Sequence, residues 1–120
     1  PETFAQLERF ILETEIDCAL INILAPLPGT LLWERLLAEG RLLLHDFPAD
    51  YAYCTQDRVY FQPAQMTPEQ LQTGAQELIS RLNRPGLLVR RAWRTWQHTH
   101  SALATLIAFE WNRRSRAALR

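Results

Sequence analysis

The sequence contains no lysine and only two cysteines, Cys18 and Cys54. Two thiols are too few for an iron–sulfur cluster of the usual all-cysteine kind. Without CxxC spacing or a secretory signal, reduced thiols are favoured over a disulfide. Cys54 also lacks the basic neighbours that would lower the pKa of its thiol. The cysteines therefore predict neither a metal site nor a reactive thiol.

Long hydrophobic runs and common catalytic motifs are missing as well. No segment approaches the roughly 20 apolar residues of a membrane span. The acidic start Pro1-Glu2-Thr3 lacks the apolar core of a signal peptide. There is no Gly-rich phosphate loop, no HExxH and no GxSxG motif. We expect a cytoplasmic chain with no membrane span and no catalytic or metal-binding residues of its own.

Arginine supplies all of the positive charge, and its distribution is uneven. Residues 1–80 contain 4 arginines and 12 acidic residues, whereas residues 81–120 contain 9 arginines and the single acid Glu110. The two parts therefore carry formal charges of −8 and +8, although the whole chain is neutral. The pair Pro85-Gly86 interrupts regular structure at the same place. We expect a boundary near residues 81–86.

The beginning of the chain predicts a helix followed by a strand. Thr3 is suited to cap a helix, with Gln6 as its capping-box partner, and apolar residues then recur at helical spacing. Residues 18–24 form a short, partly β-branched apolar run, which is typical of a strand buried on both faces of a parallel sheet. Because the expected cap lies so close to the first residue, we expect the chain to be part of a longer protein.

The remaining segments predict mostly helices. A turn at Pro28-Gly29 leads to Thr30, which is suited to cap the next helix. Thr67 and Gln70 form a second capping box. The expected elements are a helix at 31–39, an irregular stretch at 41–66 with a short strand at 58–62, a helix from 67, and helical pattern from 87 to 116 with a pause at 98–101.

Three histidines could carry chemistry, but simpler interpretations are favoured. His45-Asp46 has the residue types of an acid–base pair, yet sequence neighbours seldom point the same way and no nucleophile is near. His98 and His100 could share a metal only in an extended stretch, because in a helix they would face about 200° apart. We expect them to be surface histidines.

Asn22 is the polar residue within the apolar run 18–24. If it were buried without a hydrogen-bond partner, its amide would cost about 1–3 kcal/mol. Two interpretations stay open. The amide bonds a neighbouring backbone group, or it lines an active site at the carboxyl end of a barrel strand, where sites in parallel barrels lie.

The C-terminal part interleaves arginine with tryptophan. The residues concerned are Arg84, Arg90, Arg91, Arg94, Trp93 and Trp96. Such a pattern could bind nucleic acid or an anionic membrane surface. In the favoured interpretation the tryptophans mark the buried face of a packed helix and the arginines neutralise the acidic first part of the chain.

Three motifs follow one another in a fixed order. They are Ile21-Asn22-Ile23-Leu24-Ala25-Pro26-Leu27-Pro28-Gly29-Thr30, then Glu39-Gly40-Arg41, and then Val59-Tyr60-Phe61-Gln62-Pro63 with Met66-Thr67-Pro68-Glu69-Gln70-Leu71. Over roughly residues 1–85 the chain thereby resembles radical S-adenosylmethionine (SAM) enzymes, especially the branch that often carries an N-terminal cobalamin-binding domain. In that family the first motif is the sixth strand of a partial (βα) barrel. Residues 86–120 match only as a helical, Arg-rich tail.

The resemblance implies an α+β, predominantly helical fold. Residues 1–42 would hold the last barrel helix, the last strand and the following helix. Residues 43–66 would form an irregular segment with a short strand, and residues 67–120 a helical Arg-rich C-terminal extension. The family's cluster cysteines, spaced C-x3-C-x2-C, are missing from this sequence. The chain would therefore be the C-terminal part of a radical SAM oxidoreductase or methyltransferase, and would close the barrel of its parent.

The resemblance also implies cofactors, a site and partners. The parent would hold SAM and a 4Fe–4S cluster, with cobalamin in some members, whereas the chain itself would hold no cofactor. Asn22 and Ala25 match the positions where the sixth strand offers backbone to SAM and a side chain to the substrate. The partner would be the remainder of the parent chain. An isolated strand 18–24 would have bare edges, so we expect self-association of the chain alone.

The alternative function belongs to a different class. A stand-alone helical module would bind a protein partner or nucleic acid through the Arg/Trp-rich helix, although nucleic acid is not favoured. An open reading frame that extends far upstream and contains the C-x3-C-x2-C spacing would distinguish the enzyme part from the module.

Overall fold

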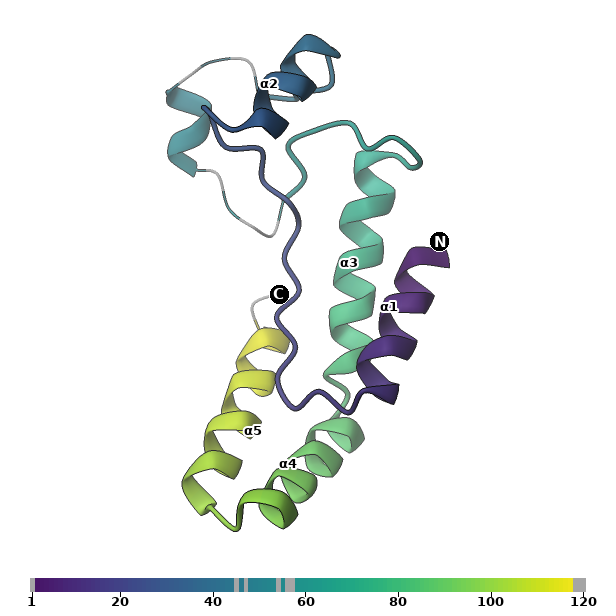
Figure 1. The fold of residues 1–120 in the computed structure, drawn as a ribbon, viewed down its shortest axis with the longest axis vertical. Coiled ribbons are helices and arrows are strands. Elements are labelled where there is room, and N and C mark those ends of the chain that lie inside the picture. The colour runs from purple at the N-terminus through teal and green to yellow at the C-terminus, as the bar shows by residue number, and fades with distance from the viewer. Residues whose placement is uncertain (1, 45, 47, 54, 56–57, 118–120) are drawn as a thin grey trace. The chain divides into compact units, whose positions relative to one another are not determined.

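The computed structural model describes residues 2–44, 46, 48–53, 55 and 58–117. The described part is predominantly helical (Figure 1). Its helices are α1 (Glu2–Glu13), α2 (Leu31–Ala38), the short 3-10 helix η1 (Ala49–Tyr53), α3 (Pro68–Leu82), α4 (Pro85–Thr99) and α5 (Ala102–Ala117). None of these helices combines the length and apolarity that a membrane crossing requires.

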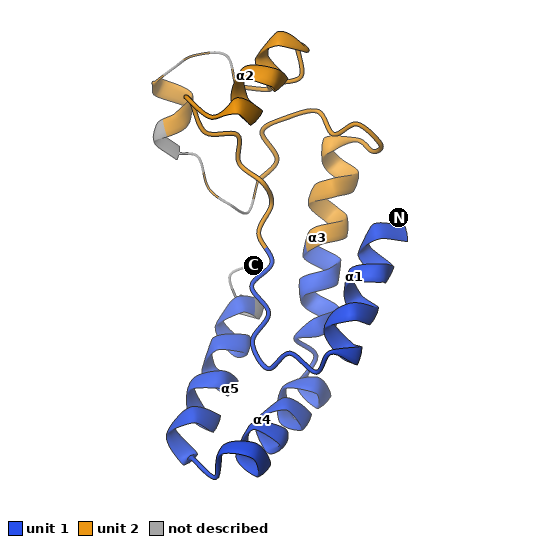
Figure 2. Ribbon diagram, in the orientation of Figure 1, with its two compact units in different colours: residues 1–21, 76–120 blue, residues 22–75 orange. Residues whose placement is uncertain are grey.

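The chain divides into two compact units (Figure 2). The first unit joins residues 1–21 to residues 76–120, so it brings the two ends of the sequence together. The second unit contains residues 22–75. Helix α3 begins in the second unit and ends in the first.

The core of the first unit forms where α1 packs on the end of α3. Ile11, Leu78 and Leu82 are buried against one another, and four half-buried apolar residues surround them: Phe4, Ile16, Ala19 and Ile21. At the edge of this cluster, Arg81 Nε donates to Glu8 Oε2 at 2.9 Å. Truncating a buried leucine such as Leu78 to alanine costs about 2–5 kcal/mol, because the cavity closes only in part.

Helices α4 and α5 form a hairpin in the same unit. His100 ends α4 in the left-handed conformation, with a φ of 49°, and its amide donates to Trp96 O at 2.8 Å. Ser101 Oγ then accepts from the Ala104 amide at 3.2 Å, which caps α5. The expected pause at residues 98–101 is therefore confirmed as the turn between two helices.

The second unit is organised by the caps predicted from the sequence. Thr30 Oγ1 accepts from the Trp33 amide at 3.3 Å at the start of α2. Thr67 and Gln70 form the reciprocal capping box of α3, with bonds of 2.9 and 3.2 Å. Gly40 has a φ of +65° directly after α2, a conformation that a side chain would strain.

The predicted strand at residues 18–24 and the partial barrel are not seen. These residues form no β-bridge, and the bridge between Leu42 and Phe61 is the one found in the described part of the chain. A strand is held by hydrogen bonds to a neighbouring strand, and the described residues provide no such neighbour for 18–24. The short strand expected at 58–62 is reduced to that single antiparallel bridge.

The prediction that Thr3 caps the first helix is also wrong. Helix α1 begins at Glu2, so Thr3 lies inside the first turn instead of capping it. Glu2 and Thr3 are both exposed. The helix itself, with Ile11 on its buried side, is as expected.

Candidate functional site

Asn22 and Ala25, the residues expected to face SAM and the substrate, lie in the irregular segment before α2. Asn22 is exposed, Ala25 is half-buried, and the Pro26 side chain is fully buried. Exposure alternates along residues 19–25, with the odd-numbered positions turned inward. Such alternation is typical of an extended backbone. The side chains of Asn22 and Ala25 therefore lie on opposite sides of the segment.

The turn that follows this segment is well defined. The Thr30 amide donates to Leu27 O at 3.2 Å, and Thr30 Oγ1 donates to the same oxygen at 2.7 Å. Gly29 has a φ of +80°, which favours glycine. The turn therefore fixes the path of the chain between Ala25 and the first turn of α2.

The other sequence candidates do not assemble into a catalytic site. His45 and Cys54 lie outside the described residues. His98 and His100 are exposed at the end of α4, as expected, and no group of three His, Cys, Asp or Glu side chains gathers in the described part. Cys18 is exposed and unpaired by any disulfide. Partial burial and the nearby Asp17 raise the pKa of its thiol, although Arg91 opposes this shift, so the thiol is not activated.

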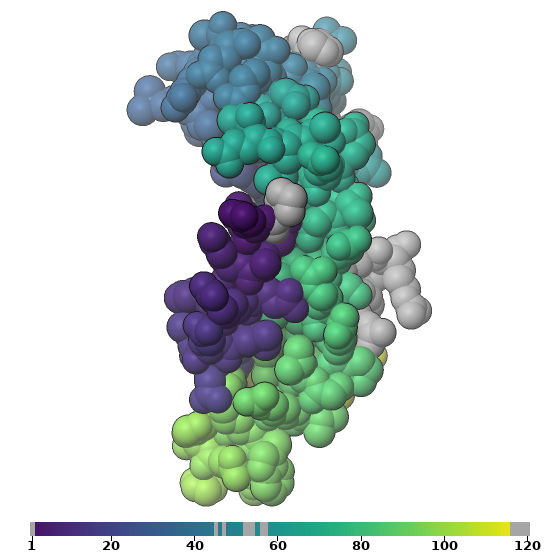
Figure 3. All heavy atoms as spheres, turned by 90° about the vertical axis from the view of Figure 1, so that its right-hand side faces the viewer, coloured from purple at the N-terminus to yellow at the C-terminus, as the bar shows by residue number. Residues whose placement is uncertain are grey.

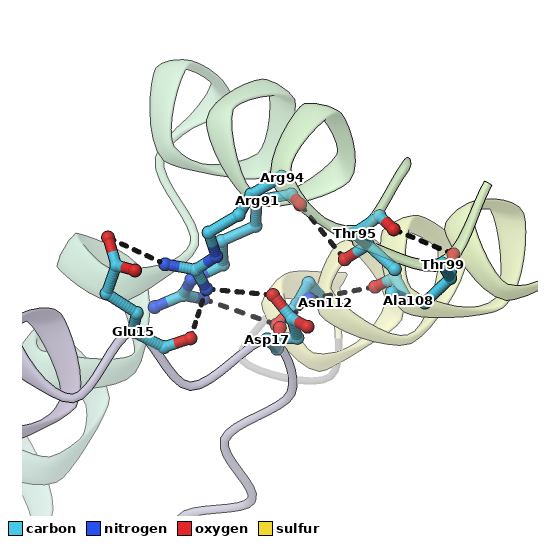
Figure 4. Close-up of polar contacts among 8 residues, drawn as sticks. All are labelled: Glu15, Asp17, Arg91, Arg94, Thr95, Thr99, Ala108 and Asn112. Carbon is cyan, nitrogen blue, oxygen red and sulfur yellow. Dashed lines mark hydrogen bonds and ion pairs between the residues drawn. The ribbon is translucent and has the colours of Figure 1, made fainter. Parts of the chain in front are cut away.

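A polar network in the first unit ties the segment after α1 to α4 (Figure 4). Arg94 Nη2 donates to Asp17 Oδ1 at 2.8 Å and to the backbone oxygen of Glu15. Its Nη1 lies 3.3 Å from Glu15 Oε1. These contacts raise the pKa of Arg94, mainly through the bond to Asp17. Glu15 itself has a φ of 56°, so the network holds a strained turn in place.

The same network continues into the interface between α4 and α5. Asn112 Nδ2 donates to Asp17 O and to Ala108 O, both at 2.8 Å. Arg91 Nη1 donates to Asn112 Oδ1 at 3.4 Å, and Arg91 Nη2 is buried without a hydrogen-bond partner among the described residues. Burial lowers the pKa of Arg91, and repulsion from Arg94 adds to the shift. The network contains no nucleophile and no acid–base pair, so its described contacts are structural.

Only part of this network could be predicted from the sequence. The expected neutralisation of acids by the basic tail is confirmed for Arg94, and also for Arg81 through Glu8. Asn112 was missed, although its signal is visible as a polar residue four positions after Ala108 on the apolar side of a helix. The expectation that Trp93 and Trp96 are buried is wrong, since both are exposed. The inward positions of α4 belong to Arg91 and Thr95 instead.

Comparison with known proteins places the chain in a family. A family model described as "Domain of unknown function (DUF4070)" matches residues 30–118, which is most of the chain. The chain belongs to this family. The match begins at the cap of α2 and includes α3, α4 and α5.

Among curated proteins, the DUF4070 chain is similar to the hopanoid C-2 methylase of Rhodopseudomonas palustris (strain TIE-1). The two are 50% identical over 46 residues, which cover 38% of this chain and 8% of the methylase. The aligned stretch is thus a small part of that protein's length. No solved structure matches the chain significantly.

Within the DUF4070 region, the Glu39-Gly40-Arg41 motif has a structural role. Glu39 accepts from Arg35 Nε at 2.8 Å and from Arg41 Nη1 at 2.6 Å. Arg41 Nε also donates to Gln62 O at 2.8 Å, beside the Leu42–Phe61 bridge. The bonds to Arg35 and Arg41 lower the pKa of Glu39. The motif therefore joins the end of α2 to the segment before α3.

Proposed function

We propose that this DUF4070 chain is the C-terminal part of a cytoplasmic radical SAM oxidoreductase or methyltransferase, in which it closes the barrel and contributes to the SAM and substrate site. The three ordered motifs and the similarity to a methylase support this proposal. The caps at Thr30 and Thr67 form as the motifs predict. The chain adds structure to its parent and performs no catalysis alone.

The proposal rests on the exposure of residues 18–24 and on their lack of a β-bridge in the described part. Leu20 and Leu24 are 68% and 55% exposed, whereas Ile23 is buried. An extended segment with apolar side chains turned outward and no β-bridge in the described part has the features of a strand that lacks its sheet. Such a segment pairs readily with strands from another source. In the proposal, the remainder of the parent supplies those strands.

The donor groups of the segment fit the role proposed for them. The exposed amide of Asn22 can both donate and accept a hydrogen bond, as recognition of a polar substrate group requires. Ala25 offers backbone next to a rigid turn. The side chains of Asn22 and Ala25 face opposite sides of the segment. In the proposal, Asn22 would therefore contact the ligand through its side chain and Ala25 through its backbone.

The residues of this chain do not fit an iron–sulfur cluster. Cys18 and Cys54 are its only thiols, and the described part has no group of metal-binding side chains. The proposal therefore assigns the 4Fe–4S cluster, its radical chemistry and any cobalamin-dependent methyl transfer to the remainder of the parent. No step of that chemistry is assigned to a residue of this chain.

Anaerobic reconstitution with iron and sulfide tests the proposal. We expect the intact parent to acquire the visible absorbance of a 4Fe–4S cluster and to release 5′-deoxyadenosine from SAM under reducing conditions. The 120-residue chain alone is expected to stay colourless. Hydrogen exchange on the intact parent should show protected amides at residues 19–24. A parent that does not cleave SAM, or a cluster bound by the chain alone, would contradict the proposal.

A nucleic-acid-binding module has weaker support. Of the four arginines that suggested it, Arg91 is buried and Arg94 is engaged by Glu15 and Asp17. Arg84 and Arg90 are the two left exposed on α4, and no ion pair joins them to other described residues. Two arginines neutralise few phosphates, so this surface would bind nucleic acid weakly.

A further inference from the structure

The α4–α5 hairpin has polar residues inside and apolar residues outside. Its buried positions among the described side chains are the polar Arg91, Thr95 and Asn112 and the apolar Leu88 and Ala108. Its exposed large apolar residues are Val89 (63%), Trp93 (61%), Trp96 (41%), Leu103 (68%), Leu106 (58%), Ile107 (58%) and Trp111 (49%). In water, large apolar side chains usually fill the contact between helices, whereas most of those in this hairpin are exposed. An apolar exterior of this extent marks a surface that meets another apolar phase or partner.

Polar contacts inside the hairpin add to the small apolar contribution of Leu88 and Ala108. Asn112 bonds Arg91 and the Ala108 carbonyl, and Thr95 Oγ1 donates to Arg91 O at 3.0 Å. Thr99 Oγ1 donates to Thr95 O at 2.7 Å (Figure 4). Small and hydrogen-bonding residues between helices, with apolar residues outside, are typical of helix pairs in contact with lipid.

Charged residues are also unevenly distributed along the length of the hairpin. Residues 95–109, which form the turn and the helix ends beside it, contain no arginine and no acidic residue. Exposed arginines lie away from the turn: Arg84 at the N-cap of α4, Arg90 on α4, and Arg113 and Arg114 on α5. Glu110 pairs with Arg113 and Arg114. Arg84 and Arg90 are exposed and form no ion pair with another described residue. Figure 3 shows the yellow-green atoms of the hairpin at the surface of the first unit.

We propose that the turn of the α4–α5 hairpin, residues 95–109, docks into the surface of an anionic lipid bilayer. From Thr95 to His100 a helix rises about 7.5 Å, which matches the roughly 5–10 Å to which interfacial helices are buried. Leu103, Leu106 and Ile107 enter the boundary between headgroups and acyl chains. Trp93 and Trp96 lie at headgroup depth, where tryptophan is favoured. The contact is interfacial, because neither helix is long enough to span.

The two unpaired arginines determine which lipid is preferred. Arg84 and Arg90 lie beyond the uncharged turn on α4, where phosphate groups would meet them. Each cation near an anionic surface contributes on the order of 1 kcal/mol, and salt screens this attraction. The proposal therefore commits to an anionic bilayer and predicts weaker binding at high salt.

Vesicle flotation of the intact parent protein tests the proposal. The vesicles contain either phosphatidylcholine alone or phosphatidylcholine mixed with phosphatidylglycerol. We expect flotation with the mixed vesicles and a loss of about tenfold or more in affinity for the double variant Leu106→Ser/Ile107→Ser. Arg84→Gln/Arg90→Gln should remove the preference for the anionic mixture. Leu31→Ser is the matched control, since Leu31 is 85% exposed on α2 of the other unit.

Further measurements separate lipid from other occupants of the surface. Circular dichroism and thermal melts check that each variant is folded, which we expect because the replaced side chains are exposed. The fluorescence change on vesicle binding should decrease in Trp93→Phe/Trp96→Phe. Wild-type binding that equals the binding of Leu106→Ser/Ile107→Ser would overturn the proposal. The proposal would also be overturned if the wild type never floated and the two serines abolished a dimer in sedimentation or a complex with RNA.

Discussion

Arg94 and Asp17 are 77 positions apart in the sequence, yet Arg94 Nη2 lies 2.8 Å from Asp17 Oδ1. The Arg94 side chain is mostly buried, whereas the Asp17 side chain is 42% exposed. A second contact joins Arg94 to Glu15. Because α1 is followed at once by these acids, the pair fixes the early segment of the chain against α4.

Replacing Arg94 with glutamine should destabilise the first unit by about 1–2 kcal/mol. Bonds to charged groups contribute about 1.5–3 kcal/mol, and partial exposure reduces that value. Urea denaturation of the folded parent, read by hydrogen exchange at α1 and α4, measures the change. Arg90→Gln is the control on the same helix, because Arg90 is exposed. Equal effects of the two variants would contradict the importance of the Arg94–Asp17 contact.

Asn112→Leu should lower the free energy of unfolding, although the two side chains are similar in size. Leucine is close in volume, but the carbonyls of Asp17 and Ala108 would lose their donor and Arg91 would lose its acceptor. Leaving buried polar groups unpaired costs about 1–3 kcal/mol. The free energy of unfolding is expected to decrease by this amount, whereas Gln97→Leu, at an exposed position of α4, should change it little. A neutral Asn112→Leu would show that the buried network contributes nothing to stability.

Local elements of this fold could be predicted from the sequence, but contacts between distant residues could not. The caps at Thr30 and Thr67 depend on neighbours three residues away, so a short motif determines them. The role of residues 18–24 depends on pairing partners, which a propensity pattern cannot supply. Trp93 and Trp96 were predicted inside because aromatic residues usually are. Arg91 and Thr95 are buried instead, where Arg91 donates to Asn112 Oδ1 and Thr95 Oγ1 donates to Arg91 O.

The carboxyl group of Glu39 should titrate below the ordinary range of glutamate. Its pKa is lowered first by Arg35 and then by Arg41. A lowered folded-state pKa means that the stabilisation is present above the unfolded-state pKa and is lost as pH falls through the folded value. Carboxyl-carbon NMR should show this, and Arg35→Gln should move the Glu39 pKa upward. An unchanged Glu39 titration in Arg35→Gln would contradict the assignment.

In the intact parent, Asn22→Leu should leave folding unchanged and reduce turnover. The residue is exposed in this chain, and in the proposed function its side chain faces the substrate. Thermal melts and single-turnover cleavage of SAM separate the two effects. Gln65→Leu, another exposed polar residue in the second unit, should alter neither quantity. A loss of stability with full activity per folded molecule would instead make Asn22 a structural residue.

The isolated 120-residue chain should associate with itself through residues 18–24. The segment has no β-bridge in the described part, and Leu20 and Leu24 are exposed on one side of it. An extended segment that carries apolar side chains and forms no β-ladder invites pairing with a second copy, which takes the place that the parent's strands occupy in the proposal. Light scattering in moderate salt should report a dimer or larger assembly.

Positive charges on the segment test that mechanism. Two ammonium groups would repel the same residues of a second copy and would cost several kcal/mol if the pairing buried them. Leu20→Lys/Leu24→Lys should therefore shift the chain toward a monomer. Leu31→Lys, on the strongly exposed Leu31 of α2, should leave the assembly intact. If Leu31→Lys disrupts association and the double variant does not, the contact lies on the second unit's helix instead. A wild-type chain that is monomeric at every concentration would show that residues 18–24 need no partner, and it would weaken the proposal that a parent sheet completes them.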